Sequence, residues 1–259
     1  MKQSFRSIFF ATLFLTAISA LSHAGTLPVP FFPGEKLAFR VKWSFIPAGE
    51  VLLEILPMET LNGIESYHFK MTARTYAYID PFYMVRDRID AYTDAALTHT
   101  ILYEKEQYGK SKRKVTVQFD WEKNEAQYAE IEEKREPLHV PPGSFDPLSI
   151  FYFFRLFDLE KRREIEVSVT DGKRWVLGKA TVLKKEKIEV ASGLYDTYLV
   201  EPDLKQIGGV FKKKRDAKLQ IWVSADRWRI PVRIRSQVAV GSFVAELVSF
   251  EQGEAINKE

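Results

Sequence analysis

Histidines that could act as a general base or a metal ligand are scarce in this 259-residue chain. His68 lies between Tyr67 and Phe69 in an alternating segment, which favours a surface position on the opposite face of a strand. His99 and His139 lie near expected turns, without the spacing to serine and acid that a hydrolase needs. The Gly-x-Ser-x-Gly elbow and the His-Glu-x-x-His motif are both absent. The sequence therefore predicts neither a serine-hydrolase centre nor a metal site.

Other catalytic signatures are also missing. The tripeptide Gly109-Lys110-Ser111 matches the end of a phosphate-binding loop, but the upstream glycine is missing and strand patterns flank it. Cysteine is absent, which excludes disulfides, thiolate metal sites and a cysteine nucleophile. Carboxylates are plentiful, but a glycosidase pair depends on a separation in space that sequence spacing does not reveal. We therefore expect a protein that is not an enzyme and uses no cofactor.

The sequence contains more candidate residues for ligand binding than for catalysis. Arg155 lies in an otherwise apolar segment, and a buried guanidinium needs a partner or a wet cavity. An ion pair that locks this segment to the rest of the protein is favoured over a ligand anchor. Trp43, Tyr152 and Trp222 join Arg155 as candidate ligand-binding residues, although tryptophans are more often core or rim residues. The basic run Lys212, Lys213, Lys214 and Arg215 is a solvated loop or a contact with anionic lipid headgroups.

One apolar segment must position these groups, because it is the only convincing helix after residue 24. Phe145 to Phe157 is apolar on nearly every side, which predicts a helix over 146–157 that is buried all round. Asp146 suits the N-cap, where its carboxylate accepts from free N–H groups of the first turn. Pro147 suits the first helical position, which needs no N–H.

Most of the remaining chain has the alternation of β-strands, punctuated by turn signals such as Asn62-Gly63 and Asp171-Gly172. Residues 82–92 are ambiguous, and we assign them to a strand because they lack a helical stripe. The expected strands cover 35–43, 50–56, 66–77, 82–92, 98–108, 112–120, 125–132, 164–170, 174–187, 188–202, 217–224, 230–240 and 242–251. The fold class is therefore mainly β: a curved antiparallel sheet that forms an open or half barrel, or a sandwich, around one apolar helix.

The first 24 residues have the pattern of a secretory signal peptide. Lys2 and Arg6 precede the apolar run 8–18, which is shorter than a membrane span, and Ser22-His23-Ala24 suits cleavage after Ala24. We expect an exported, periplasmic protein that is soluble after cleavage, with no later transmembrane segment. Cleavage would lower the formal net charge from +3 to +1, which gives no case for a nucleic-acid partner. Residues 25–259 then form one β-rich domain, with a possible seam between two halves near 133–145, where prolines gather.

Three ordered motifs carry a resemblance to a known family. They are Phe39-Arg40-Val41-Lys42-Trp43 with Ala48-Gly49, Asp146-Pro147-Leu148-Ser149 with Tyr152 and Arg155, and Trp222-Val223-Ser224-Ala225-Asp226 with Ile230-Pro231-Val232-Arg233-Ile234. In this order they resemble the exported bacterial family catalogued as domain of unknown function 3108. The resemblance implies an exported β-rich domain and no known reaction. The closing strands are also similar to the periplasmic lipoprotein-carrier fold, a half-barrel around helices.

Two functions remain open, with a hydrolase as the third. A curved sheet with surplus aromatics suits a non-catalytic binding or carrier module for an apolar or lipid-like ligand. This predicts a cavity of several hundred cubic ångströms between helix and sheet. A structural or assembly factor that binds other envelope proteins predicts instead a filled core and an exposed apolar patch. A hydrolase would require converging carboxylates or a Ser–His contact.

Overall fold

The structure is a computed structural model that describes residues 28–109, 112–130, 133–203, 218–238 and 241–254. The predicted signal segment and the basic run 212–215 lie outside these residues. The elements are β1 (Lys36–Trp43), β2 (Ile46–Leu61), β3 (Ile64–Thr75), β4 (Arg86–Asp94), β5 (Thr100–Tyr108), β6 (Lys112–Asp120), β7 (Glu125–Glu130), β8 (Glu133–Lys134), β9 (Leu138–His139), α1 (Ser149–Phe154), β10 (Glu164–Thr170), β11 (Trp175–Val190), β12 (Gly193–Pro202), β13 (Lys218–Ser224), β14 (Pro231–Val238) and β15 (Gly241–Glu251).

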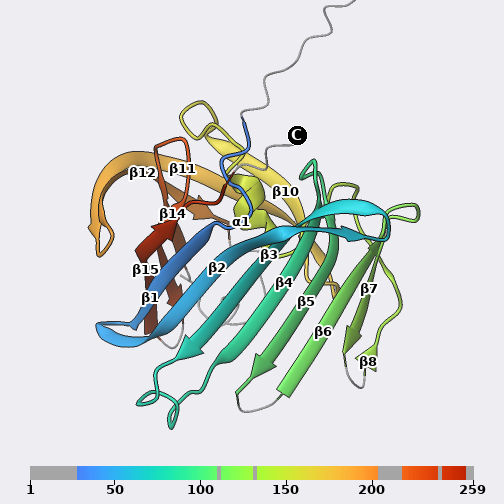
Figure 1. Ribbon diagram of the computed structural model, residues 1–259, viewed down its shortest axis with the longest axis horizontal. Helices are drawn as coiled ribbons and strands as arrows, with labels where there is room; N and C mark the ends of the chain where they lie inside the picture. The colour runs from blue at the N-terminus through green and yellow to red at the C-terminus, as the bar shows by residue number, and fades with distance from the viewer. Residues whose placement is uncertain (1–27, 110–111, 131–132, 204–217, 239–240, 255–259) are drawn as a thin grey trace, which may run out of the picture.

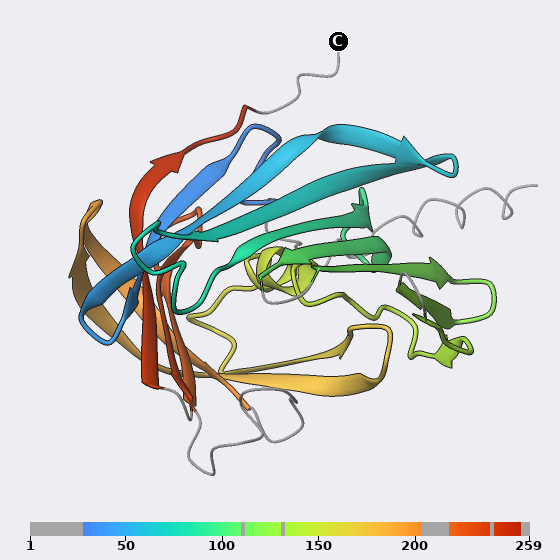
Figure 2. The same cartoon turned by 90° about the horizontal axis from the view of Figure 1, so that it is seen from below.

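All of these strands belong to one antiparallel sheet (Figure 1). Its order is β10-β11-β12-β13-β14-β15-β1-β2-β3-β4-β5-β6-β7-β8, and β9 pairs with β7. The sheet bends around α1 without closing, because β10 and β8 end it and do not pair with each other (Figure 2). The prediction of a curved, open antiparallel sheet around a single helix is therefore confirmed. The strands on both sides of residues 133–145 belong to this same sheet.

The concave face of the sheet is built by alternation within each strand. Leu37 and Phe39 of β1 are almost completely buried, while Lys36 and Arg40 beside them are exposed. The hairpin between β2 and β3 turns through Asn62 and Gly63, both with positive φ (51° and 82°), as a tight two-residue turn requires. Because side chains alternate with a period of two, the antiparallel register carries this apolar row from strand to strand.

The Asp146 side chain caps the turn that leads into α1, although the residue that directly precedes the helix is Leu148. Oδ1 of Asp146 accepts hydrogen bonds from the backbone N–H groups of Leu148 (2.7 Å) and Ser149 (2.9 Å). Oδ2 accepts from the Thr100 hydroxyl at 2.7 Å, and the same hydroxyl oxygen accepts from the Asp146 N–H. Asp146 thus satisfies the first turn and also attaches the helix to β5.

The helix is shorter than the predicted span of 146–157. Regular helix covers only Ser149–Phe154, and residues 155–157 continue as tighter turns. Their N–H groups bond to carbonyls three residues back, from Arg155 to Tyr152, Leu156 to Phe153 and Phe157 to Phe154. Within the described part of the chain, no helix has the length and apolarity of a membrane span.

The strand predicted over 82–92 begins later than expected. The chain turns through residues 76–83, where N–H groups of Ile79, Asp80 and Phe82 bond to nearby carbonyls. The Asp80 carboxylate then holds the Arg86 guanidinium at 2.6 Å. Strand β4 starts only at Arg86, because the backbone before it forms the turn around Asp80-Pro81 and is not available for strand pairing.

Candidate ligand cavity

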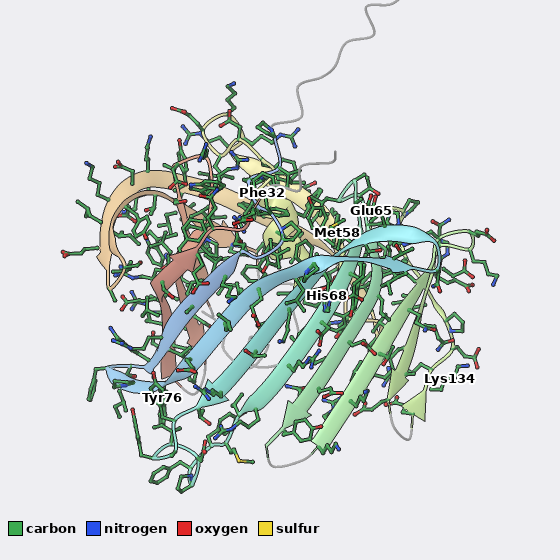
Figure 3. The ribbon with its side chains drawn as sticks, in the orientation of Figure 1. Phe32, Met58, Glu65, His68, Tyr76 and Lys134 are labelled. Carbon is green, nitrogen blue, oxygen red and sulfur yellow. The ribbon has the colours of Figure 1, made fainter. Side chains whose placement is uncertain are left out.

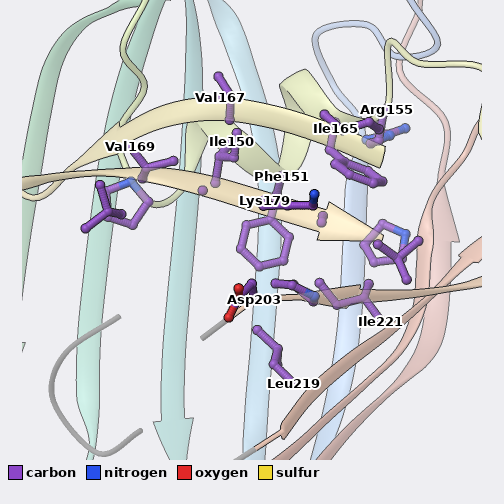
Figure 4. A pocket seen from close by; sticks show the side chains of 18 of the residues that line it. Ile150, Phe151, Arg155, Ile165, Val167, Val169, Lys179, Asp203, Leu219 and Ile221 are labelled. Carbon is purple, nitrogen blue, oxygen red and sulfur yellow. The ribbon is translucent and has the colours of Figure 1, made fainter. Parts of the chain in front are cut away.

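A cavity of about 500 Å³ lies between α1 and strands β10–β13, and we call it the ligand cavity (Figure 4). Its walls are mainly aliphatic and aromatic, with a few charged residues among them. The lining residues used below are Ile150, Phe151, Phe154, Arg155, Ile165, Val167, Val169, Gly178, Ala180, Leu219, Ile221, Val223 and Arg229.

Two elements face each other across the ligand cavity. From the helix come Ile150, Phe151 and Phe154, which recur at helical spacing and are only half-buried. The prediction that the helix is buried all round is therefore wrong for this side, because among the described residues no side chain fills the space opposite it. From β10 come the alternating residues 165, 167 and 169, and the neighbouring strand contributes the small residues Gly178 and Ala180. Small residues at these positions leave the wall thin and the space open.

The opposite side of the helix is packed. The Tyr152 ring stacks on Phe69 at 3.9 Å between centroids, and Phe31 meets both rings edge-on. Burial raises the pKa of the Tyr152 hydroxyl. Leu148 and Ser149 are buried on the same side. This side anchors the helix to β3 and to the segment before β1.

Arg155 completes the anchor through a buried ion pair. Its guanidinium donates to both carboxylate oxygens of Glu35, at 2.6 and 2.8 Å, and the two residues are 2% and 1% exposed. It also donates to the Trp228 carbonyl at 3.0 and 3.1 Å. A bidentate ion pair with additional hydrogen-bond acceptors is the arrangement that offsets the cost of burying a guanidinium. The interpretation of Arg155 as an ion-pair lock is therefore confirmed, although Glu35 precedes β1.

Arg229 also belongs to the lining, and the sequence reading overlooked it. Its Nε donates to the Arg155 carbonyl, while its Nη2 is buried and has no hydrogen-bond partner among the residues that the structure describes. Burial lowers the pKa of Arg229, and the nearby Arg155 charge acts in the same direction. A guanidinium keeps its proton at neutral pH, so this wall of the ligand cavity carries a positive charge.

The predicted ligand-binding residues do not come together. Only Arg155 lines the ligand cavity, and Tyr152 points to the packed side of the helix. Trp43 stacks on Phe243 at the end of β1. Trp222 lies on the other face of β13 from Ile221 and Val223, and its Nε1 donates to Glu186 at 2.9 Å. The role of these four residues in ligand binding stays a prediction.

His68 is buried, so the prediction of a surface position is wrong. Its Nδ1 lies 2.7 Å from Glu59 and its Nε2 lies 2.8 Å from Asp90, while its ring stacks on Tyr92. Burial acts to raise the pKa of Asp90, but hydrogen bonds from His68 and Arg88 outweigh it and lower the pKa to about 2. The sequence could not show this, because a register shift in β2 between Leu56 and Glu59 brings the glutamate over the histidine.

His99 and His139 have contacts that differ from those of a hydrolase centre. Nδ1 of His99 lies 2.8 Å from the hydroxyl of its neighbour Thr98, and its ring packs on Trp121. His139 is exposed. Among the residues that the structure describes, no cluster of histidine and carboxylate side chains has the geometry for a metal ion.

The walls of the ligand cavity had a signal that sequence reasoning did not use. Ile165, Val167 and Val169 alternate in β10, and their partners Ala180, Gly178 and Val176 in β11 are small or β-branched. A strand whose large residues pair with small residues of the neighbouring strand indicates a cavity more specifically than the presence of tryptophans does.

These features define a class: an open antiparallel sheet that wraps a short anchored helix and leaves an apolar hollow beside it. The chain belongs to the family described as "Protein of unknown function (DUF3108)", whose model matches residues 38–248. The resemblance drawn from the three motifs is therefore confirmed. A comparison with curated proteins found no match.

Solved structures resemble this chain at low sequence identity, and one of them has a TM-score above 0.5. A beta-barrel-like protein of domain of unknown function DUF1849 from Brucella abortus has a TM-score of 0.56 and 10% identity, over 87% of this chain and all of that chain. A candidate lipoprotein from Parabacteroides distasonis has a TM-score of 0.35 and 10% identity, over 86% of this chain and 98% of its own. A candidate exported protein from Bacteroides fragilis with a YmcC-like fold has a TM-score of 0.33 and 7% identity, over the same shares. The Brucella structure supports the open-barrel architecture.

Proposed function

We propose that this protein is an exported, non-catalytic binding or carrier module that holds an apolar, lipid-like ligand in the ligand cavity. The observation that carries the proposal is an apolar hollow of about 500 Å³. Cavities that bind small molecules span about 300–1,000 Å³ and are lined mainly by apolar side chains. A protein that used its sheet only as a scaffold would gain stability by filling this space.

The position of charge suggests the chemistry of the ligand. Arg229 lines the ligand cavity with an unpaired Nη2, whereas Arg155 is neutralised by Glu35. An acyl chain would contact residues such as Phe151 and Ile221, and a polar or acidic headgroup would be favoured near Arg229. The proposal of a non-catalytic role rests on the mainly apolar lining, whose described polar residues include Asp171, Lys179 and Asp203 but no histidine or serine.

The test combines native mass spectrometry with a binding titration. Protein purified gently from the envelope should carry a co-purifying lipid-like mass. The ligand-free protein should bind cis-parinaric acid, a fatty acid that fluoresces in apolar sites. In Ile221→Trp the larger ring fills the ligand cavity, so we expect binding to weaken by about tenfold or more.

Leu177→Trp is the matched control, because Leu177 is exposed and lies beside Gly178 in β11 but is not part of the lining. It should bind the probe like the unmodified protein. Equal binding by the two variants, or the absence of both a co-purifying lipid and probe binding, would overturn the proposal.

A further inference from the structure

A second apolar feature lies outside the ligand cavity, at one end of the sheet. Large hydrophobic side chains there are exposed on the turn between β1 and β2, on the loop between β3 and β4, and at the end of β5. We call this set the aromatic edge; its members are Trp43, Phe45, Ile46, Tyr78, Phe82, Tyr83, Met84 and Tyr108. Phe45 is 85% exposed and Phe82 is 79% exposed, so neither contributes to a core.

The segments that carry these residues lie at the same end of the sheet and contact one another. Because the strands are antiparallel, the β1–β2 turn, the β3–β4 loop and the end of β5 fall at the same end of the sheet. The Tyr78 hydroxyl donates to the Pro47 carbonyl at 2.5 Å, which joins the first two segments. Gly109 lies so close to the Met84 carbonyl that an added Cβ would approach it to 2.7 Å, which joins the third. Figure 3 shows Tyr76 at this end of the sheet, with Phe32 and Glu65 towards the other end.

Charges are few around the aromatic edge, and the acids Asp80 and Glu50 are each paired with an arginine. In segments 43–46 and 75–85 the only charged residue is Asp80, and Arg86 neutralises it at 2.6 Å. Arg74 and Lys112 flank these segments, with the Lys112 ammonium over the Tyr108 ring at 5.1 Å. Arg74 pairs with Glu50 on the surface, where ion pairs are weak and exchange readily. The tips are therefore apolar and aromatic, with a weakly cationic border.

This combination suits one kind of partner. Tryptophan and tyrosine concentrate at membrane–water interfaces, where an aromatic ring meets both acyl chains and headgroups. Neighbouring lysine and arginine side chains are attracted to lipid phosphates. A protein partner would equally cover apolar area, but it would not require aromatic tips with almost no charge between them.

We propose that the aromatic edge docks on the surface of a phospholipid bilayer, with Phe45, Phe82 and Tyr83 inserted among the headgroups. Docking in this orientation would bring one end of the ligand cavity towards the bilayer. The strand register connects the two, because Trp43 is opposite Phe243, Phe243 is opposite Ser236, and Ser236 is opposite the lining residue Leu219.

The test is flotation with vesicles of phosphatidylethanolamine and phosphatidylglycerol. The protein should float with the vesicles, and Phe45→Ser/Phe82→Ser/Tyr83→Ser should weaken binding by about tenfold or more. The three side chains are exposed, so their removal should leave the unfolding midpoint unchanged. The matched control is Leu177→Ser/Leu183→Ser/Leu194→Ser, which removes three exposed leucines from β11 and β12 and should float like the unmodified protein.

The salt dependence of flotation and the oligomeric state of the protein distinguish bilayer docking from purely electrostatic binding and from dimer formation. Inserted aromatic rings are not screened, so part of the binding should persist at high salt. Failure to float, equal flotation of both triple variants, or complete loss in salt would overturn bilayer docking. So would a dimer in light scattering that the aromatic triple variant dissolves, because a second copy would then cover the edge. The cavity variant Ile221→Trp should still float, so failure of bilayer docking and failure of the proposed function are distinguishable.

Discussion

The two sides of α1 differ in how completely they are packed. On one side, which we call the packed side, Tyr152 stacks on Phe69 and Arg155 pairs with Glu35 inside the protein. On the other side, the cavity side, Ile150, Phe151 and Phe154 remain half-buried beside a hollow. One six-residue helix therefore has a filled contact and an unfilled one, although its sequence is apolar on both.

This difference separates a structural task from the proposed binding task. The packed side carries Arg155, whose guanidinium is paired with the Glu35 carboxylate and also hydrogen-bonded to the Trp228 carbonyl. Such a contact resists movement of the helix. The cavity side leaves apolar surface without partner atoms, which forfeits dispersion contacts unless a ligand supplies them. The helix is thus a fixed wall against which a ligand can pack.

Removal of the Glu35 side chain should cause the largest loss of stability on the packed side. In Glu35→Ala the Arg155 guanidinium stays buried without its carboxylate, which costs about 3–5 kcal/mol of unfolding free energy. Urea denaturation measures the loss. The control Glu164→Ala removes an exposed partner of Lys179 and should cost less than about 1 kcal/mol. Similar losses for the two variants would mean that the ion pair does not anchor the helix.

A pair of alanine substitutions compares the two sides directly. Tyr152→Ala should cost about 3–5 kcal/mol, because it removes a fully packed ring. Phe151→Ala, one residue earlier, should cost much less, because its ring already borders the hollow. The order should reverse for binding of cis-parinaric acid, where only Phe151→Ala removes a contact with the ligand. Equal stability losses in urea would contradict the distinction between the sides.

Local features of the fold could be predicted from the sequence. Asp146 was identified as a cap, and most strands were placed within a few residues, because capping and alternation depend on neighbours in the chain. Partners far apart in sequence could not be found. Glu35 lies 120 positions from Arg155, and Glu59 reaches His68 only through an irregular register.

The ligand cavity shows the same limit. Its existence depends on the bend of β10–β13 over the helix, and each of its wall residues alone reads as an ordinary buried strand position. The aromatic candidates follow from residue type alone, and three of the four candidates lie elsewhere because tryptophan and tyrosine are more often core or rim residues than ligand contacts. The sequence does not identify Arg229 as a lining residue, because a turn sets its position and no neighbouring residue indicates its role.

The Asp146 carboxylate, at the start of the helix, makes a smaller, pH-dependent contribution to stability. Burial raises the pKa of Asp146 above its ordinary value of 3.8, although the N–H groups of Ser149 and Leu148 and the Thr100 hydroxyl oppose the shift. The folded protein therefore holds this proton to higher pH than the unfolded chain does. This contribution to stability is complete below about pH 3.8 and is lost as the pH rises through the folded-state pKa.

Asp146→Asn removes the titration and keeps an oxygen that can accept from Leu148 and Ser149. We therefore expect the stability of the unmodified protein, relative to Asp146→Asn, to be greatest in acid and to decline as the pH rises towards neutrality. Urea denaturation at a series of pH values measures this difference. Asp196→Asn, at an exposed position of β12, should show no such trend. A relative stability that increased with pH would mean that the three hydrogen bonds outweigh burial, and the cap would then favour the charged carboxylate.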